Sequence, residues 1–259
     1  RVLFRSATLD QREAPLAMHP DEFRKLGYSL VDEIAGFLGS LPTRPVTPAE
    51  GPQQVRGILG AADALPEEGA DAGALLSKAT TLLFDHSLFN GHPRFWGYVT
   101  SSAAPIGALG DLLASAVNPN VGAWKLSPIA SEIEAQSVRW VADLIGYPTT
   151  CGGLLVSGGN MANFAGFLAA RTSKLGGQVR KVGILGTSHQ GIRVYASEET
   201  HTWIQKAVDL FGFGTDSIRW ISTDSKQRLQ IHELRKVIET DRKNGDTPFL
   251  VVGTAGTVS

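Results

Sequence analysis

A glycine-rich turn carries the strongest chemical signal in the sequence. In LLVSGGNMANFAGFLAAR, residues 154–171, an apolar run is joined to an amphipathic helix by Ser157, Gly158, Gly159 and Asn160. Small residues let backbone N–H groups approach a ligand, and the helix dipole favours negative charge at this end. The pattern therefore predicts an anion cradle that could hold a phosphate group. A tight turn in which Asn160 caps the helix is the simpler alternative.

Two better-known phosphate-binding patterns do not match this turn. It lacks the six-position glycine fingerprint of dinucleotide-binding proteins and the lysine of nucleotide-triphosphate loops. Neither NAD nor ATP is indicated, and the phosphate of another cofactor remains open.

His201 is the second chemical candidate. It lies in YASEETHTWIQKA, residues 195–207, where a strand is predicted to end and His201 to fall in the first turn of the next helix. Ligands of α/β proteins bind at the carboxyl ends of strands, and an imidazole there could stack on a flat ring or transfer a proton. A histidine that caps the helix or lies on the surface is the alternative. A third segment, VVGTAGTVS (251–259), places small hydroxylated residues at another predicted strand end.

The elements that must position these residues alternate between short strands and helices. Apolar, β-branched runs predict strands at 154–156, 193–197, 218–222 and 249–256. Helical patterns lie between them and end at Arg171, or cover residues 200–210 and 231–242. This alternation predicts an α/β fold with a mainly parallel sheet flanked by helices.

The preceding sequence is predicted to be helical. Amphipathic patterns cover residues 21–38, 73–89, 106–117 and 129–145. The stretch from Leu41 to Gly69 is rich in Pro, Gly, Ala and Glu, which indicates an extended connection with at most a short helix around 55–59. We expect an N-terminal helical arm and linker over residues 1–70 and the main domain over 71–259.

Composition favours a small-molecule ligand. Of the 259 residues, 42% are hydrophobic and 19% charged, as in globular proteins. Lysines and arginines number 24 and acidic residues 25, so charge gives no argument for binding nucleic acid or an anionic membrane. No apolar run approaches the roughly 20 residues that span a bilayer.

Cysteine and histidine positions argue against a metal site. Cys151 is the single cysteine, which excludes an internal disulfide and a cysteine-based zinc site and favours a reducing compartment such as the cytoplasm. Four histidines show no carboxylate or cysteine spacing for a metal: His19, His86, His189 and His232. His92, in HPRF, is predicted to order a turn.

Five segments in a fixed order resemble one known family. They are GHPRFWGYVTS (91–101), WKLSPIASEIE (124–134), CGGLLVSGGNMANFAGFLAAR (151–171), SEETHTWIQKA (197–207) and GTAGTVS (253–259). Together they resemble the pyridoxal-phosphate-dependent decarboxylases, the group that acts on aromatic amino acids, tyrosine, histidine, glutamate and cysteine sulfinate. The resemblance covers about residues 20–259 and implies the fold-type-I architecture of pyridoxal-phosphate enzymes, with a large domain present here only in part.

The resemblance implies a pyridoxal 5′-phosphate site at the two chemical candidates. Gly159 and Asn160 are expected to contact the phosphate, Ser157 and Gly158 to shape the turn, and His201 to stack on the pyridine ring. The family has Ser or Thr followed by Glu where this chain has Asn and Met, which keeps a side-chain donor and loses a carboxylate.

Other residues inherit expected roles from the same resemblance. Thr254 and Thr257 are expected beside the cofactor. The substrate pocket is expected to include Tyr98, Thr100, Ser101 and Trp124. For the segment around Tyr98, a buried aromatic strand that packs on the core is the alternative.

The implied activity is decarboxylation of an L-amino acid, with an aromatic substrate expected. The family's active site lies at a homodimer interface, so helix 21–38 is expected to reach the partner. The cofactor-binding lysine and the aspartate at the pyridine nitrogen follow the GTAGT segment in the family. We therefore expect this chain to be a fragment that lacks both residues and is inactive alone. Another lyase of the same fold, resembling sphingosine-phosphate lyase, an aminotransferase and a non-catalytic homologue are the alternatives.

Overall fold

The computed structural model describes residue 14 and residues 16–186 and 191–257. The chain divides into two compact units, Arg1–Gly110 and Asp111–Ser259. His189 and the last two residues of the GTAGTVS segment lie outside the described residues. The functional division expected at residue 70 stays a prediction.

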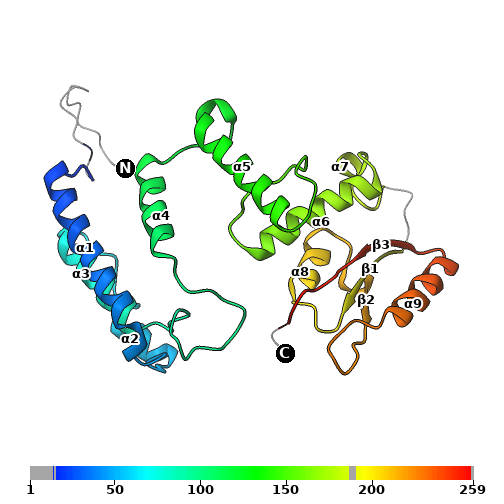
Figure 1. Ribbon diagram of the computed structural model, residues 1–259, viewed down its shortest axis with the longest axis horizontal. Coiled ribbons are helices and arrows are strands. Elements are labelled where there is room, and N and C mark those ends of the chain that lie inside the picture. Colours follow the sequence, from blue (N-terminus) through cyan, green and yellow to red (C-terminus); the bar gives the residue numbers. More distant parts are fainter. Residues whose placement is uncertain (1–13, 15, 187–190, 258–259) are drawn as a thin grey trace. The chain divides into compact units, whose positions relative to one another are not determined.

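The first unit is helical (Figure 1). Its elements are α1 (Pro20–Ser40), η2 (Leu41–Thr43), α2 (Pro52–Leu59) and α3 (Ala72–Asp85), and α4 (Pro105–Val117) crosses into the second unit. The rings of Phe37 and Phe84 stack with centroids 4.3 Å apart and join α1 to α3. Helix α3 ends four residues before the predicted Phe89, because the backbone turns and Phe89 N–H donates to Val46 O (3.0 Å).

His92 orders the turn of the HPRF segment, as predicted. Its ring is buried, with 2% of the residue exposed, and Nε2 lies 2.9 Å from Arg44 O. Arg94 N–H donates to Nδ1 at 3.0 Å. Because a carbonyl only accepts and a backbone N–H only donates, these contacts assign the proton to Nε2.

The second unit is an α/β layer structure. Its helices are η3 (Trp124–Leu126), α5 (Pro128–Leu144), α6 (Gly159–Leu175), α7 (Val179–Val182), α8 (Trp203–Leu210), η4 (Thr215–Ser217) and α9 (Ile231–Lys243). Its strands are β1 (Ile192–Ser197), β2 (Ile218–Ile221) and β3 (Thr247–Val251). They form one sheet in the order β2-β1-β3, and both pairs are parallel. This confirms the predicted α/β class.

Helices cover both faces of this sheet because successive side chains of β1 point to opposite sides. Val194 and Ala196, both fully buried, pack in one cluster with Phe167 of α6 and Ile204 of α8. Tyr195, also fully buried, points to α9. Figure 1 shows α8 and α9 on opposite sides of the strands.

The predicted strand at 154–156 is wrong. Leu154 and Leu155 are 61% and 65% exposed, and the segment pairs with no strand of the described chain. Leu155 N–H donates instead to Glu134 Oε1 of α5 at 2.8 Å. An apolar run forms a strand only when its backbone can pair with a neighbouring strand. Here a carboxylate accepts the backbone N–H of Leu155 instead.

The bounds of β3, α6 and α8 also differ from the prediction, and β3 ends at Val251 rather than at residue 256. Helix α6 continues to Leu175, past the predicted Arg171. Helix α8 begins at Trp203 rather than Thr200, because Thr200 N–H donates to Ser197 O (2.9 Å) in a turn that follows the strand. No helix of the described residues has the length and apolar character to cross a membrane.

A buried polar network fastens α9 to the sheet. Tyr195 Oη donates to Asp241 Oδ2 at 2.9 Å, and Arg219 donates to the same carboxylate at 3.1 Å. Arg193 Nε donates to Asp246 Oδ2 at 2.8 Å. Asp241 is only 4% exposed, so these hydrogen bonds take the place of water around its carboxylate. Burial and, second, the hydrogen bond to Asp241 raise the pKa of Tyr195 far above its ordinary value.

Removing the Asp241 carboxylate is expected to destabilise the second unit. Asp241→Ala leaves Tyr195 and Arg219 without their shared acceptor and should lower the free energy of unfolding by about 3 kcal/mol. Glu239→Ala, an exposed position on the same helix, should change it by less than about 0.5 kcal/mol. Urea denaturation followed by tryptophan fluorescence measures both. Equal effects of the two substitutions would contradict the role of the network.

Tyr195 should also make stability fall at alkaline pH. The unfolded chain releases the phenol proton near its ordinary pKa of 10.0, whereas the folded chain retains it. The proton therefore stabilises the fold below this pH, and the stabilisation is lost as the pH rises, by at most about 1.4 kcal/mol per pH unit. Tyr195→Phe should flatten this decline in urea midpoints measured from neutral pH to pH 11. An unchanged slope would show that the phenol ionises normally.

Candidate active site

The glycine turn begins α6 without a side-chain cap. Gly158 occupies the cap position with φ +137° and ψ 171°, a backbone region that is essentially restricted to glycine. The first helical hydrogen bond is Ala162 N–H to Gly158 O, at 3.0 Å. The N–H groups of Gly159, Asn160 and Met161 consequently have no partner within the helix. The alternative in which Asn160 caps the helix is wrong, since Asn160 is the second residue of α6.

The turn and His201 open into the same cavity, which we call the cradle cavity. Its volume is about 570 Å³, within the range of small-molecule sites. The lining residues are Ser157, Gly158, Gly159, Asn160, Met161, Asn163, His201 and Trp203. The structure thus brings together five predicted residues from two segments about 40 positions apart in the sequence.

His201 lies just before α8 rather than in its first turn. Trp203 N–H donates to His201 Nδ1 at 3.2 Å. A backbone N–H cannot accept, so Nδ1 is unprotonated and the ring proton is on Nε2. The imidazole is exposed, and the hydrogen bond from the backbone N–H of Trp203 fixes the plane of its ring. One face of the imidazole is therefore available to stack on a flat ring of a ligand.

Sequence reasoning missed Asn163 and Trp203 as lining residues. Asn163 is three positions after Asn160, and this spacing places two residues on one face of a helix. Trp203 is two positions after His201, and its half-buried side chain also packs against the core. Helical spacing could have identified Asn163 as a lining residue. Trp203 could be identified only once the position at which α8 begins was known.

The cradle cavity fits a ligand with a phosphate and a flat ring. An ideal Cβ built on Gly158 or Gly159 would meet no atom within 4 Å, so a ligand oxygen can approach the backbone here. N–H groups that have no partner within their helix suit an anion, as does the helix dipole. The imidazole of His201 suits an aromatic ring beside it.

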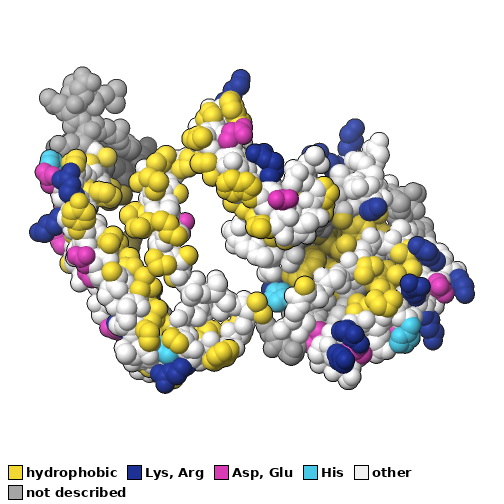
Figure 2. Space-filling view, viewed as in Figure 1, with side chains coloured by type: hydrophobic (Ala, Val, Ile, Leu, Met, Phe, Trp, Pro, Cys, Tyr) yellow, Lys and Arg dark blue, Asp and Glu magenta, His cyan; other side chains and the backbone are white. Residues whose placement is uncertain are grey.

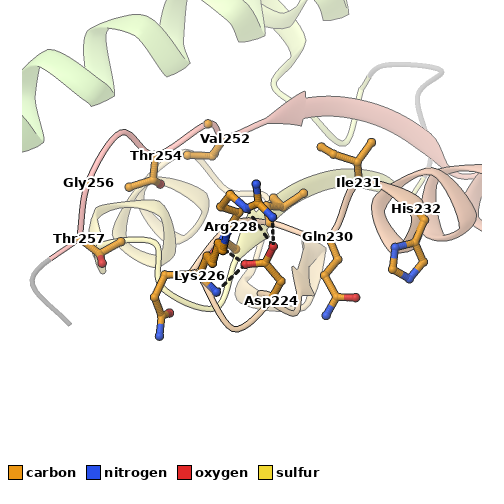
Figure 3. Close-up of a pocket in the computed structure, with 14 residues that line it drawn as sticks. Asp224, Lys226, Arg228, Gln230, Ile231, His232, Val252, Thr254, Gly256 and Thr257 are labelled. Carbon is orange, nitrogen blue, oxygen red and sulfur yellow. Dashed lines mark hydrogen bonds and ion pairs between the residues drawn. The ribbon is translucent and has the colours of Figure 1, made fainter.

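Thr254 and Thr257 line a second cavity of about 840 Å³ at the carboxyl ends of β1 and β3. Figure 3 shows both threonines on the segment after β3, facing the loop that follows β2. The hydroxyl of Thr254 lies 3.2 Å from that of Thr200, the residue before His201. This hydrogen bond joins the GTAGT segment to the SEETH segment.

Two charged residues on the loop side of this second cavity, Asp224 and Arg228, form an ion pair. Arg228 donates through Nε and Nη2 to Asp224 Oδ2 at 2.9 and 2.8 Å, as Figure 3 shows. These contacts hold the pKa of Asp224 at about 2, chiefly through the side-chain hydrogen bond from Arg228. Asp224 is therefore ionised near neutral pH and serves to order the loop.

The other predicted pocket residues lie outside both cavities. Trp124 begins η3, is 57% exposed, and donates from Nε1 to Glu132 Oε1 at 2.9 Å. Tyr98, Thr100 and Ser101 belong to the first unit and are exposed.

The segment around Tyr98 is not a buried aromatic strand. Trp96 and Tyr98 are 90% and 79% exposed, and the segment has no strand structure. Tyr98 also has a positive φ of 61°, which is uncommon for a residue other than glycine. Such backbone strain is found preferentially at functional sites.

No group of three metal-binding side chains lies together among the residues that the structure describes. Four of the lysines, Lys125, Lys174, Lys181 and Lys206, are exposed.

Comparison with known proteins decides the family. Residues 52–259 match the Pyridoxal-dependent decarboxylase conserved domain. The chain belongs to this family. The predicted cofactor, pyridoxal 5′-phosphate, is thereby confirmed at the level of the family, and the cradle cavity has the groups to hold it.

Individual relatives agree with this family. An aromatic-L-amino-acid decarboxylase from Bacillus atrophaeus is 32% identical over 244 residues, which are 94% of this chain and 48% of the relative. A tyrosine decarboxylase from Oryza sativa subsp. japonica is 30% identical over 95% of this chain and 46% of the relative. The chain thus spans about half the length of these curated relatives.

The fold is also that of a solved relative. The crystal structure of Oryza sativa TDC with PLP and tryptamine superposes with a TM-score of 0.82 and 27% identity, over 96% of this chain and 51% of the other. The predicted fold-type-I architecture, with part of the large domain, is confirmed.

The backbone of Gly158 should be decisive for the turn. Gly158→Ala forces a side chain into its positive-φ conformation and should destabilise the chain by about 1–3 kcal/mol or displace the turn. Gly159→Ala, one position later in a helical conformation and with open space around its Cβ, is the matched control for stability. Urea denaturation compares the two, and similar unfolding energies would show that the turn is not strained.

Proposed function

We propose that the whole protein decarboxylates an L-amino acid, preferentially an aromatic one, to the amine and CO2 with pyridoxal 5′-phosphate. The observation that carries this proposal is the cradle cavity, where the glycine turn and His201 meet. Membership of the decarboxylase family supports the reaction type, and relatives named for aromatic amino acids and tyrosine support the substrate class.

Different residues of the chain bind different parts of the cofactor. The free N–H groups of Gly159 and Asn160 hold the phosphate, and Ser157 and Gly158 keep the turn open. His201 stacks on the ring while Trp203 N–H fixes its Nδ1. The cofactor, when bound, supplies the electron sink that decarboxylation requires and that no side chain provides.

Thr254 and Thr257 lie beside the cofactor in this proposal. The hydrogen bond between Thr254 and Thr200 supports it, because it links the GTAGT segment to the residue next to His201. The amino-acid substrate is held by Tyr98, Thr100, Ser101 and Trp124.

A homodimer is part of the proposal, with α1 as an arm toward the partner. Hydrophobic side chains gather along α4 and along α5 on the face shown in Figure 2. Leu112 and Leu113 of α4 are 48% and 66% exposed, and Trp140 and Leu144 of α5 are 61% and 85% exposed. Exposed apolar side chains gathered along a helix favour a protein interface there. A cytoplasmic location is proposed from the single cysteine.

We propose that this chain lacks the cofactor-binding lysine and the pyridine-nitrogen aspartate that catalysis needs. Lys125, Lys174, Lys181 and Lys206 are exposed and line neither cavity. Lys226 lines the second cavity but not the cradle cavity. We propose that the chain alone is inactive.

Covalent capture of the cofactor tests this point. The chain is mixed with a stoichiometric amount of pyridoxal 5′-phosphate, reduced with borohydride and digested for mass spectrometry. Scattered, low labelling of exposed lysines is expected, whereas the full-length protein should be labelled at one lysine. Stoichiometric labelling of a single lysine within this chain would contradict the proposal.

Activity of the full-length protein tests the function itself. Release of CO2 and amine from a panel of L-amino acids should be greatest for tyrosine, phenylalanine or tryptophan analogues. Formation of keto acid would instead indicate an aminotransferase, and no turnover would indicate a non-catalytic homologue.

Tyr98 provides a residue-level test of the substrate pocket. Tyr98→Ala removes an aromatic wall and should lower kcat/KM for aromatic substrates about tenfold, mainly through KM. Tyr147→Ala, at another exposed tyrosine, is the control and should leave kcat/KM unchanged. An unaltered KM for Tyr98→Ala would remove Tyr98 from the pocket.

A further inference from the structure

Trp203 has the position of a ligand-binding residue, although the family resemblance assigns it no role. It lines the cradle cavity together with the glycine turn and His201. Its side chain is half-buried and packs against the core cluster that contains Phe167 and Val208. Trp203 therefore lies where the core cluster and the cradle cavity meet.

The chemistry of the indole matches the ligand proposed for this cavity. Its flat surface can contact an aromatic ring, and its N–H group donates but cannot accept a hydrogen bond. No partner for this N–H is found among the described residues, whereas the Trp124 N–H is paired with Glu132. A residue with such a donor, lining a cavity beside backbone N–H groups that have no partner within α6, suits an anionic ligand.

The backbone of Trp203 acts on the same site. Its N–H donates to His201 Nδ1 at 3.2 Å and so sets the plane of the imidazole. The start of α8 thereby positions two aromatic side chains around one cavity, one before the helix and one at its first residue.

We propose that Trp203 is a further cofactor-binding residue, whose indole forms a wall of the cradle cavity and contacts bound pyridoxal 5′-phosphate. The inference rests on the proposed cofactor site. It adds a direct contact with the cofactor to those made by the glycine turn and His201.

The test uses the apo form of the protein at the full length that its gene encodes. The probe is 4-deoxypyridoxine 5′-phosphate, which keeps the ring and the phosphate but has no aldehyde to react with lysines. Calorimetry gives its Kd, and tryptophan emission reports contact with an indole. Trp203→Phe should remove most of the quenching and raise Kd about threefold, and Trp203→Ala should raise Kd about tenfold. Trp220→Phe, in β2 and outside the cradle cavity, should retain both quenching and affinity.

The outcomes separate this inference from the proposed function. If the probe binds and quenches equally in the wild-type protein and in Trp203→Phe, Trp203 is not a contact and the cofactor site stands. If the wild-type protein does not bind the probe, both the site and the role of Trp203 are overturned. Should Trp203→Ala fail to fold because the indole packs on the core, the quenching of Trp203→Phe decides alone.

Discussion

The burial of β1 on both faces is the constraint on which the second unit depends. The strand has a parallel neighbour on each side, and its alternating side chains are enclosed by α6 and α8 on one face and by α9 on the other. A strand so enclosed has one register and one direction. Its carboxyl end therefore delivers the SEETH segment, and His201 with it, to a defined place beside the start of α6.

The start of α6 shows how binding and stability compete at this place. A helix is ordinarily stabilised by a side-chain cap that satisfies its first N–H groups. Here a glycine occupies the cap position and a second glycine follows, so these groups remain available. The helix is instead stabilised through its buried side, where Phe167 stacks on Phe211 with centroids 5.3 Å apart. Packing thus supports a helix end that is left open to a ligand.

The polar network between α9 and the sheet stabilises the second unit, and its residues do not line the cradle cavity. Val194 and Tyr195 are neighbours in β1 and point to opposite faces of the sheet. Val194 packs in the apolar cluster, and Tyr195 belongs to the polar network. Asp241 accepts from Tyr195 and Arg219, and this ties α9 to two strands. The loop between β2 and α9 is then held at the carboxyl edge of the sheet, where it lines the second cavity.

The sequence alone determined the class of fold, the approximate places of strands β1 to β3 and the glycine turn at Ser157 to Asn160, because periodicity and glycine spacing are local properties. It also indicated the cofactor, since five motifs in order are more specific than any one of them. Tertiary structure decided what depended on neighbours: residues 154–156 form no strand because Glu134 takes the Leu155 N–H, and Asn160 does not cap α6 because the chain turns at Gly158. It also brought His201 and Trp203 close to the glycine turn, from which about 40 residues separate them in the sequence.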